Sequence, residues 1–231
     1  IGIGETILDI LFKNEQPTAA VPGGSSFNGL ISLGRAGLDV TFISEVGNDR
    51  VGKNILNFMK ENGVNSKHVC VYPESKSPIS LAFLNEKNDA EYEFYKDYPN
   101  LRLDVELPEV NADDIVMFGS FYAVSPLLRD KMKELLDKAR DKGAIIYYDV
   151  NFRSTHKNDA IKLLPTILEN FEYASIVRGS LFRQDTVTIC VMGDMMMHSA
   201  QIQNASRGKR GYDFSSYFMY IRDRISEADI A

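Results

Sequence analysis

The chain has 231 residues, of which 44% are hydrophobic and 25% are charged, a composition typical of a folded globular protein. Its formal net charge is −6, which argues against nucleic acid as a partner. The sequence contains no apolar run long enough to cross a bilayer and no visible secretory signal. Its two cysteines, Cys70 and Cys190, lack metal-binding spacing, so we expect reduced thiols in a cytoplasmic protein without a membrane partner.

Predicted strands and helices alternate along the chain. A short buried strand over residues 1–5 begins in the middle of its apolar pattern, so we expect a few residues to precede it. Ser125 and Pro126 are expected to begin a long helix that Gly143 ends. The alternation predicts an α/β protein with a mostly parallel sheet that helices cover on both faces, and with ligands at the carboxyl ends of its strands. The other predicted strands lie at residues 40–43, 68–72, 114–118, 144–148 and 174–177, and the other helical segments at 30–36, 50–62 and 159–170.

Two weaker segments predict a smaller piece of sheet. Residues 11–21 alternate weakly between polar and apolar side chains, and residues 79–98 contain two alternating runs around a polar turn. We expect the two segments to pair as a small flap, although an edge hairpin without a special role would give the same pattern.

Residues 22–52 combine a glycine turn with a helix start. Gly23 and Gly24 would let a small ligand approach the backbone, and the two serines that follow are expected to cap the helix. Asn28 offers both a hydrogen-bond donor and an acceptor, which suits a polyol. The alternative is an ordinary glycine turn before a packed helix.

Several of these residues resemble a known family. Gly23, Gly24, Asn28, Gly47 and Gly52 fall where the first signature of the ribokinase-like (PfkB) sugar kinases has them. The run Asp-Val-Asn-Phe-Arg at residues 149–153 resembles the corresponding segment of the fructokinase and 2-keto-3-deoxygluconate kinase branch. The resemblance extends to about residue 180. It implies a ribokinase-like α/β domain in which residues 11–21 and 79–98 form a small β lid over the sugar.

The resemblance also implies a function: phosphorylation of a sugar hydroxyl with ATP and Mg²⁺. Asp9 matches the residue that binds sugar hydroxyls in this family, but a surface Asp in a loop is the alternative. Arg153 would hold an anion near the transferred phosphate, or would only form a salt bridge at the end of a strand. A homodimer through the lid is also compatible. The expected substrate-binding residues are Asp9, Gly23, Gly24, Asn28, Asp149, Asn151 and Arg153.

The sequence departs from this family after residue 180. Its members carry a Gly-Ala-Gly-Asp run whose Asp takes the proton from the sugar hydroxyl. In this chain the nearest match is Gly193-Asp194, with Val191 where the first glycine is needed. We therefore expect a kinase domain truncated on its C-terminal side, without the catalytic Asp or the nucleotide pocket and with little turnover. A sugar-binding or dimerising remnant without catalysis is the alternative.

Residues 181–231 suggest a second, unrelated piece. Residues 186–196 resemble the opening strand of the CapA-like family of poly-γ-glutamate capsule synthesis, which is related to metallophosphoesterases. That resemblance would make Asp194 and His198 metal ligands, and a strand-end turn without metal is the alternative. Because no flexible linker separates the two pieces, we expect the join near residues 180–185 to reflect a gene deletion or an assembly error.

Overall fold

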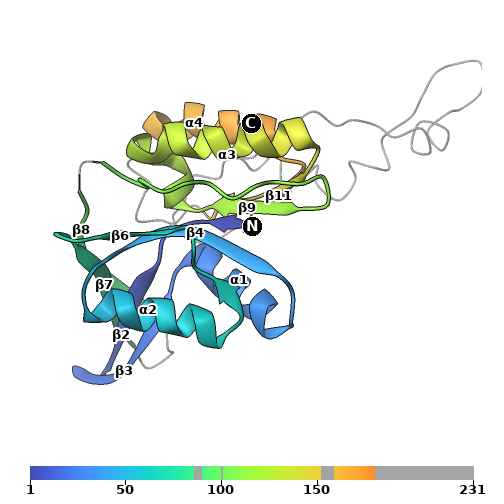
Figure 1. The fold of residues 1–231 in the computed structure, drawn as a ribbon. Coiled ribbons are helices and arrows are strands. Elements are labelled where there is room, and N and C mark those ends of the chain that lie inside the picture. The colour runs from blue at the N-terminus through green and yellow to red at the C-terminus, as the bar shows by residue number, and fades with distance from the viewer. Residues whose placement is uncertain (86–89, 100, 152–158, 180–231) are drawn as a thin grey trace, which may run out of the picture. The chain divides into compact units, whose positions relative to one another are not determined.

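The computed structural model describes residues 1–85, 90–99, 101–151 and 159–179 (Figure 1). The chain divides into two compact units. The first comprises residues 1–152 and 173–179 and contains both β-sheets. In the second unit, which comprises residues 153–172 and 180–231, the structure describes most of helix α4 (Ala160–Tyr173).

The main sheet of the first unit is parallel throughout its described pairs. Its strand order is β11-β10-β9-β1-β4-β5, and β6 pairs with β4. This arrangement confirms the predicted mostly parallel sheet. The strands run in the same direction because the long connections that contain α1, α2 and α3 carry the chain back to the starting edge of the sheet before each new strand. The strands are β1 (Gly2–Ile3), β4 (Val40–Gly47), β5 (Val64–Asn65), β6 (Val69–Tyr72), β9 (Ile115–Gly119), β10 (Ile145–Asp149) and β11 (Ile176–Arg178).

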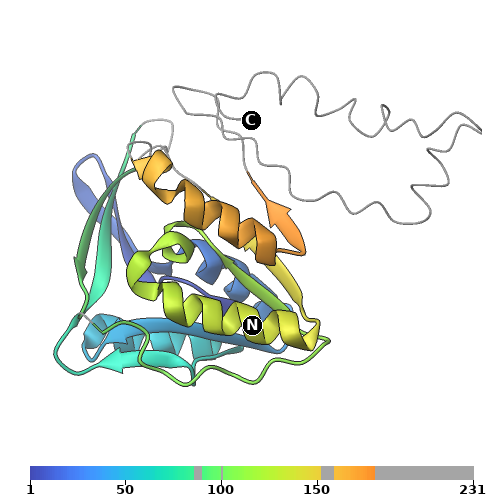
Figure 2. The same ribbon diagram turned by 90° about the horizontal axis from the view of Figure 1, so that it is seen from above.

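Helices lie on both faces of this sheet (Figures 1 and 2). Helices α1 (Ser25–Arg35) and α2 (Arg50–Glu61) share one face, where they enclose a core around Phe27, Phe42 and Met59. Helix α3 (Arg129–Lys142) covers the other face with an apolar stripe at helical spacing. The buried members of that stripe are Met132, Leu135, Leu136 and Ala139.

The start of α3 differs from the prediction. Pro126–Leu128 forms a separate 3₁₀ turn, and α3 begins only at Arg129. Ser125 makes no side-chain cap; its carbonyl oxygen instead accepts the Leu128 N–H at 3.1 Å, which closes the 3₁₀ turn. The predicted end is confirmed, because Gly143 adopts the left-handed conformation with φ 74°.

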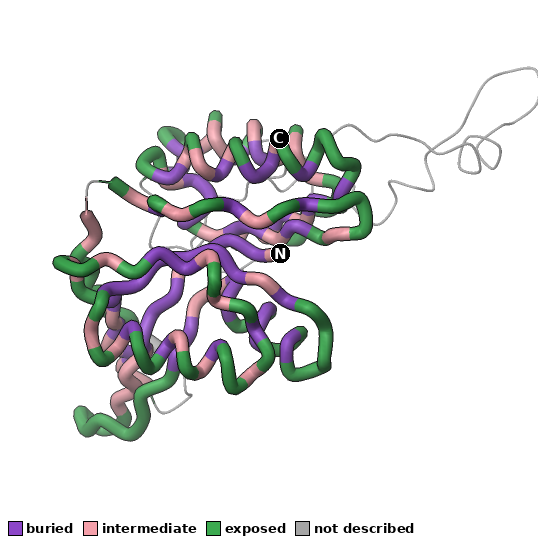
Figure 3. The backbone as a smooth tube through the Cα atoms, viewed as in Figure 1, coloured by how far each residue is buried: buried purple, intermediate pink, exposed green. Residues whose placement is uncertain are grey.

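A second, four-stranded sheet has the order β3-β2-β7-β8. Its strands are β2 (Ile7–Lys13), β3 (Gln16–Gly23), β7 (Lys76–Leu84) and β8 (Ala90–Asp97). The β2–β3 and β7–β8 pairs are antiparallel, whereas β2 and β7 run parallel. Figure 3 shows that the backbone is buried in the central strands of the main sheet and becomes exposed toward the β2–β3 turn.

The second sheet changes the position of Asp9. The sequence suggested a turn directly after the opening strand, but Asp9 lies within β2, between its neighbours Val21 of β3 and Ser80 of β7. The β2 strand begins at Ile7, which pairs with Gly23 of β3, and both Ile7 and Leu8 are buried. Among the described helices, none has the length and apolarity required to span a membrane.

Candidate active site

The glycine turn before α1 requires glycine for steric reasons. Gly24 is the N-cap residue of α1 and has φ 138°, a conformation that other residues rarely adopt. A Cβ on Gly24 would lie 2.2 Å from the carbonyl oxygen of Glu5. The predicted serine caps are wrong: no side chain caps α1, and both serines lie inside its first turn. The turn is therefore a close crossing of two backbone segments.

Three of the predicted residues converge beside this turn. A Cβ on Gly23 would lie 2.4 Å from Oδ2 of Asp9 and 3.9 Å from Oδ1 of Asn28. The other carboxylate oxygen of Asp9 accepts a hydrogen bond from the Ser80 hydroxyl at 2.5 Å. The Asp9 carboxylate and the Asn28 amide thus flank a backbone that carries no side chain. Such a surface can accept hydrogen bonds from some hydroxyl groups of a small molecule and donate hydrogen bonds to neighbouring ones.

The segment after β10 meets the start of α1. The Asn151 side-chain amide donates a hydrogen bond to the Ser25 hydroxyl at 2.7 Å, which joins two motifs that are 126 residues apart. Asp149 ends β10 and forms an ion pair with Arg178 of β11 at 3.0 Å. The Arg178 side chain is 64% exposed, so its guanidinium group stays accessible to an anion.

Two of the five non-glycine residues with positive φ in the described part of the chain lie at the same edge of the main sheet. Ser120 follows β9 with φ 58°, and Asn151 follows β10 with φ 36°. A Cβ on Gly119 would lie 2.0 Å from the Asp149 carbonyl oxygen, and this oxygen accepts the Ser120 N–H at 2.9 Å. Non-glycine residues with positive φ persist only where their surroundings compensate the cost, and such residues cluster at functional sites.

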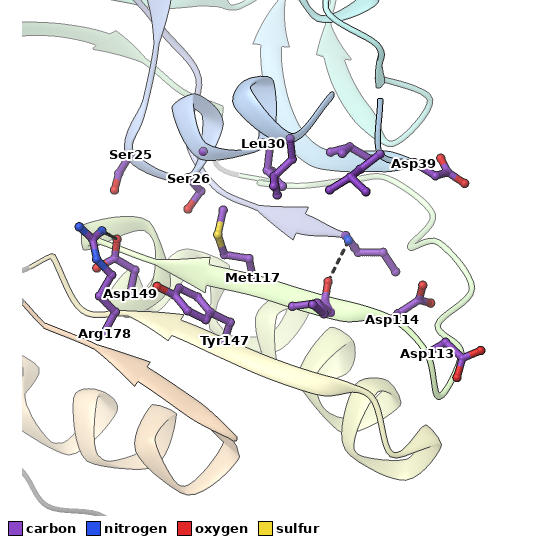
Figure 4. A pocket seen from close by; sticks show the side chains of 16 residues that line it. Ser25, Ser26, Leu30, Asp39, Asp113, Asp114, Met117, Tyr147, Asp149 and Arg178 are labelled. Atoms are coloured by element: carbon purple, nitrogen blue, oxygen red, sulfur yellow. Dashed lines mark hydrogen bonds and ion pairs between the residues drawn. The ribbon is translucent and has the colours of Figure 1, made fainter. Parts of the chain in front are cut away.

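A pocket of about 650 Å³ opens beside these groups (Figure 4). Ser25, Asp149 and Arg178 lie together at one end of it. Its walls are largely apolar and come from α1, β9 and β10, including Leu30, Met117 and Tyr147. Asp39, Asp113 and Asp114 line the opposite end.

Some predicted residues lie outside the described part of the chain. These are Arg153, Asp194 and His198, and the CapA-like resemblance of residues 185–231 lies there as well. Within the described residues, no group of three or more His, Cys, Asp or Glu side chains could hold a metal ion.

Several polar residues at the site were not predicted from the sequence. Ser80 binds Asp9, and Lys96 forms an ion pair with Glu5 at 2.7 Å, next to the Gly24 turn. Ser80 lies in an alternating segment and would have been found if the β2–β7 register were known. Because neither Glu5 nor Lys96 belongs to a motif, the sequence carries no signal for their pairing.

Comparison with known proteins identifies the family. The model of the pfkB family of carbohydrate kinases matches residues 6–182. The chain belongs to this family. The match covers every described strand except β1 (Gly2–Ile3) and ends close to residue 180, where the sequence resemblance also stops.

Known pfkB proteins resemble the chain over part of their length. The Arabidopsis thaliana protein named Probable fructokinase-5 is 25% identical over 206 residues, which cover 84% of this chain and 62% of that protein. The 5-dehydro-2-deoxygluconokinase of Geobacillus kaustophilus is 31% identical over 138 residues, covering 57% of this chain and 41% of that protein. The chain thus spans about three fifths or less of the length of these pfkB relatives.

Solved structures share the fold. An uncharacterised sugar kinase from Pyrococcus horikoshii superposes with a TM-score of 0.66 at 21% identity, covering 76% of this chain and 60% of that chain. Fructokinase from Vibrio cholerae O395 superposes with a TM-score of 0.64 at 17% identity, covering 76% and 62%. These similarities confirm the ribokinase-like α/β fold that the sequence predicted.

Proposed function

We propose that the described residues form the sugar-binding half of a kinase that transfers the terminal phosphate of ATP to a hydroxyl of a neutral sugar such as fructose. The observation that carries this proposal is the convergence of Asp9 and Asn28 over Gly23. The family assignment and the fructokinase relatives support it.

Each group has a proposed role. Asp9 accepts hydrogen bonds from two neighbouring sugar hydroxyls, and Asn28 orients a third through its amide. Asn151, held by Ser25, lies on the side where the phosphoryl group would be transferred. The second sheet acts as the lid and excludes water, because water competes with the sugar as phosphoryl acceptor.

ATP as the phosphoryl donor is inferred from the family. Sugar kinase from Pyrococcus horikoshii and fructokinase from Xylella fastidiosa have been solved with ATP. The Asn151 amide and the exposed Arg178 guanidinium are described donors that suit a phosphate group. Mg²⁺ is inferred from the family in the same way, and within the described residues no group of three or more His, Cys, Asp or Glu side chains could hold a metal ion.

A neutral sugar suits the charges around Gly23 better than a sugar acid. The Asp9 carboxylate would repel a second carboxylate, and Lys96 is already engaged by Glu5. The relatives include kinases named for both kinds of substrate, fructose and 5-dehydro-2-deoxygluconate. From the sequence, Arg153 suggested a sugar with an anionic group, but a guanidinium group at this position suits the transferred phosphate equally well.

Isothermal titration calorimetry with fructose and with 5-dehydro-2-deoxygluconate tests this proposal. We expect fructose to bind and the acid to bind at least tenfold more weakly. Asp9→Asn should weaken fructose binding by about tenfold or more, because hydrogen bonds to a charged acceptor contribute about 1.5–3 kcal/mol. Asp141→Asn, an exposed carboxylate in the last turn of α3, is the matched control and should leave binding unchanged. Binding that is indifferent to Asp9→Asn would exclude the proposed site.

A chain that binds sugar without appreciable turnover is the second candidate. The feature that favours it is the lack of a Gly-Ala-Gly-Asp run anywhere in the sequence. In that case the residues around Gly23 would bind a sugar without transferring phosphate to it. A homodimer through the second sheet is compatible with either function and stays a prediction.

A further inference from the structure

Ser80 of β7 lies directly beside the Asp9 carboxylate. The parallel pairing of β2 and β7 places the two residues opposite each other, so their side chains point to the same face of the second sheet. The Ser80 hydroxyl donates a hydrogen bond to Oδ1 of Asp9 at 2.5 Å. Because hydrogen bonds to a charged acceptor are shorter and stronger than bonds between neutral groups, this contact restrains the carboxylate.

The donor of this hydrogen bond is held in place by its surroundings. Ser80 is fully buried, and β7 is an inner strand of the second sheet, between β2 and β8. Its backbone is therefore paired on both sides, with Asp9 and with Phe94. A serine side chain has a single torsion angle that moves its oxygen, and this angle has three staggered minima. The hydroxyl oxygen of Ser80 thus has little freedom to move.

The two oxygens of the Asp9 carboxylate face different surroundings. Oδ1 is directed to Ser80, whereas Oδ2 lies 2.4 Å from the position that a Cβ on Gly23 would occupy. Oδ1 of Asn28 lies 3.9 Å from that same position. The terminal torsion of an aspartate has a broad energy minimum, so the carboxylate rotates unless a partner holds it. The bond from Ser80 to one oxygen therefore also directs the other oxygen toward Gly23.

We propose that Ser80 is a positioning residue for sugar binding. Its hydroxyl fixes the rotation of the Asp9 carboxylate, so that Oδ2 is directed at the sugar hydroxyls before the sugar arrives. This inference rests on the proposed function. Ser80 acts through Asp9 and needs no contact with the sugar. Such a fixed acceptor increases affinity because less rotational freedom is lost when the sugar binds.

Calorimetric titration of the full chain with fructose tests the inference. Ser80→Ala should weaken fructose binding about fivefold, because the carboxylate then rotates between several orientations. Ser80→Thr keeps a hydroxyl on the same carbon and should bind fructose within about twofold of the wild-type chain.

Ser77→Ala is the matched control for the loss of a hydroxyl. Ser77 lies on the same strand, and its hydroxyl donates to Oδ1 of Asp49 at 2.7 Å. That carboxylate caps α2 and belongs to no proposed sugar contact. Ser77→Ala therefore removes the same kind of bond and should leave fructose binding unchanged.

A double substitution distinguishes positioning from a general effect on the sheet. In the Asp9→Asn chain the acceptor is neutral and the bond from Ser80 is weaker. Adding Ser80→Ala to that chain should therefore change fructose binding by less than about twofold. A purely structural role would instead give the same loss in both backgrounds.

The outcomes separate the inference from the function on which it rests. If the wild-type chain binds no fructose, the proposed function itself fails. If it binds fructose and Ser80→Ala behaves like Ser77→Ala, the positioning role is excluded while the Asp9 site stands. Thermal unfolding verifies that each variant is folded at the temperature of the titration. If Ser80→Thr does not fold, the comparison of Ser80→Ala with Ser77→Ala decides the question.

Discussion

The buried carboxylate of Glu45 in β4 forms hydrogen bonds with residues from segments that are far apart in sequence. Its side chain is 1% exposed and accepts hydrogen bonds from the Arg102 Nε at 2.8 Å and the Tyr72 hydroxyl at 2.8 Å. The Tyr122 hydroxyl and the Leu103 N–H each donate at 3.2 Å. Burial and the Glu45 charge raise the pKa of both phenols, which therefore stay protonated as donors. The network anchors the chain that returns from β8 to the main sheet.

Loss of the Glu45 charge should destabilise the fold. We expect Glu45→Gln to lower the free energy of unfolding by about 3 kcal/mol, because it leaves the buried Arg102 without a counter-charge. Urea denaturation measures the change. Glu134→Gln is the control, since Glu134 pairs with Lys131 and Lys138 on the surface of α3 and such pairs contribute about 0–1 kcal/mol. Equal effects of the two substitutions would contradict the proposed importance of the buried network.

At the scale of secondary-structure elements, Asp49 connects helix α2, which packs on the main sheet, to strand β7 of the second sheet. It is the N-cap of α2 and accepts the Gly52 N–H at 2.8 Å. It also accepts the backbone N–H and the hydroxyl of Ser77 in β7, at 2.8 and 2.7 Å. Burial by itself would raise the pKa of Asp49, but these three hydrogen bonds outweigh it and lower the pKa below the usual 3.8.

The lowered pKa makes this contribution to stability depend on pH. A group with a lower pKa in the folded state stabilises fully above its unfolded pKa, and this stabilisation disappears as the pH falls through the folded value. We expect Asp49→Ala to cost about 1–2 kcal/mol at pH 7, and the cost to shrink below about pH 3.8. Denaturation at several pH values measures this difference. Asp141→Ala provides the comparison and should show no such loss; a cost of Asp49→Ala that is constant with pH would refute the argument.

At the scale of the whole molecule, the described residues leave one face of the main sheet partly open. The side chains of Ile115, Ile145 and Ile176 are about half exposed there, and Ile115 lines the same pocket as Leu33 and Leu38 of the α1 region. Their strands are registered so that Ile115 pairs with Ile145, which makes these side chains share a face. Part of this surface lines the pocket that ends at Asp149 and Arg178.

The sequence also predicts how the 231-residue chain behaves as a catalyst. Under the second candidate function, we propose that these 231 residues by themselves bind sugar but phosphorylate it slowly, since they contain no Gly-Ala-Gly-Asp run to supply the proton-accepting Asp. Loss of a general base costs about 10²- to 10⁴-fold in rate. An assay of ADP release with fructose, corrected for hydrolysis without sugar, measures this activity. Ordinary kinase rates of about 1–100 s⁻¹ would show that another residue takes the proton.

Local sequence patterns were sufficient for the fold class and for most elements. The apolar periodicity of α3 and the strand runs before Gly119 and Asp149 correspond to the observed elements within a few residues. The start of α3 was wrong because a Ser-Pro pair is compatible with a 3₁₀ turn as well as with an α-helix cap. Such an ambiguity is local, and the contacts of the following residues resolve it.

The sequence by itself determined the family and the parallel sheet and indicated Asp9 and Asn28 as candidate site residues, because periodicity and short motifs are local properties of a chain. Only the tertiary structure decided that Asp9 lies within a strand beside Gly23, that Asn151 binds Ser25, and that Ser80 binds Asp9. These relations depend on strand register and on contacts between residues separated by as many as 126 positions. A shift of one residue in register would turn every side chain of a strand to the other face, and no local pattern specifies that choice.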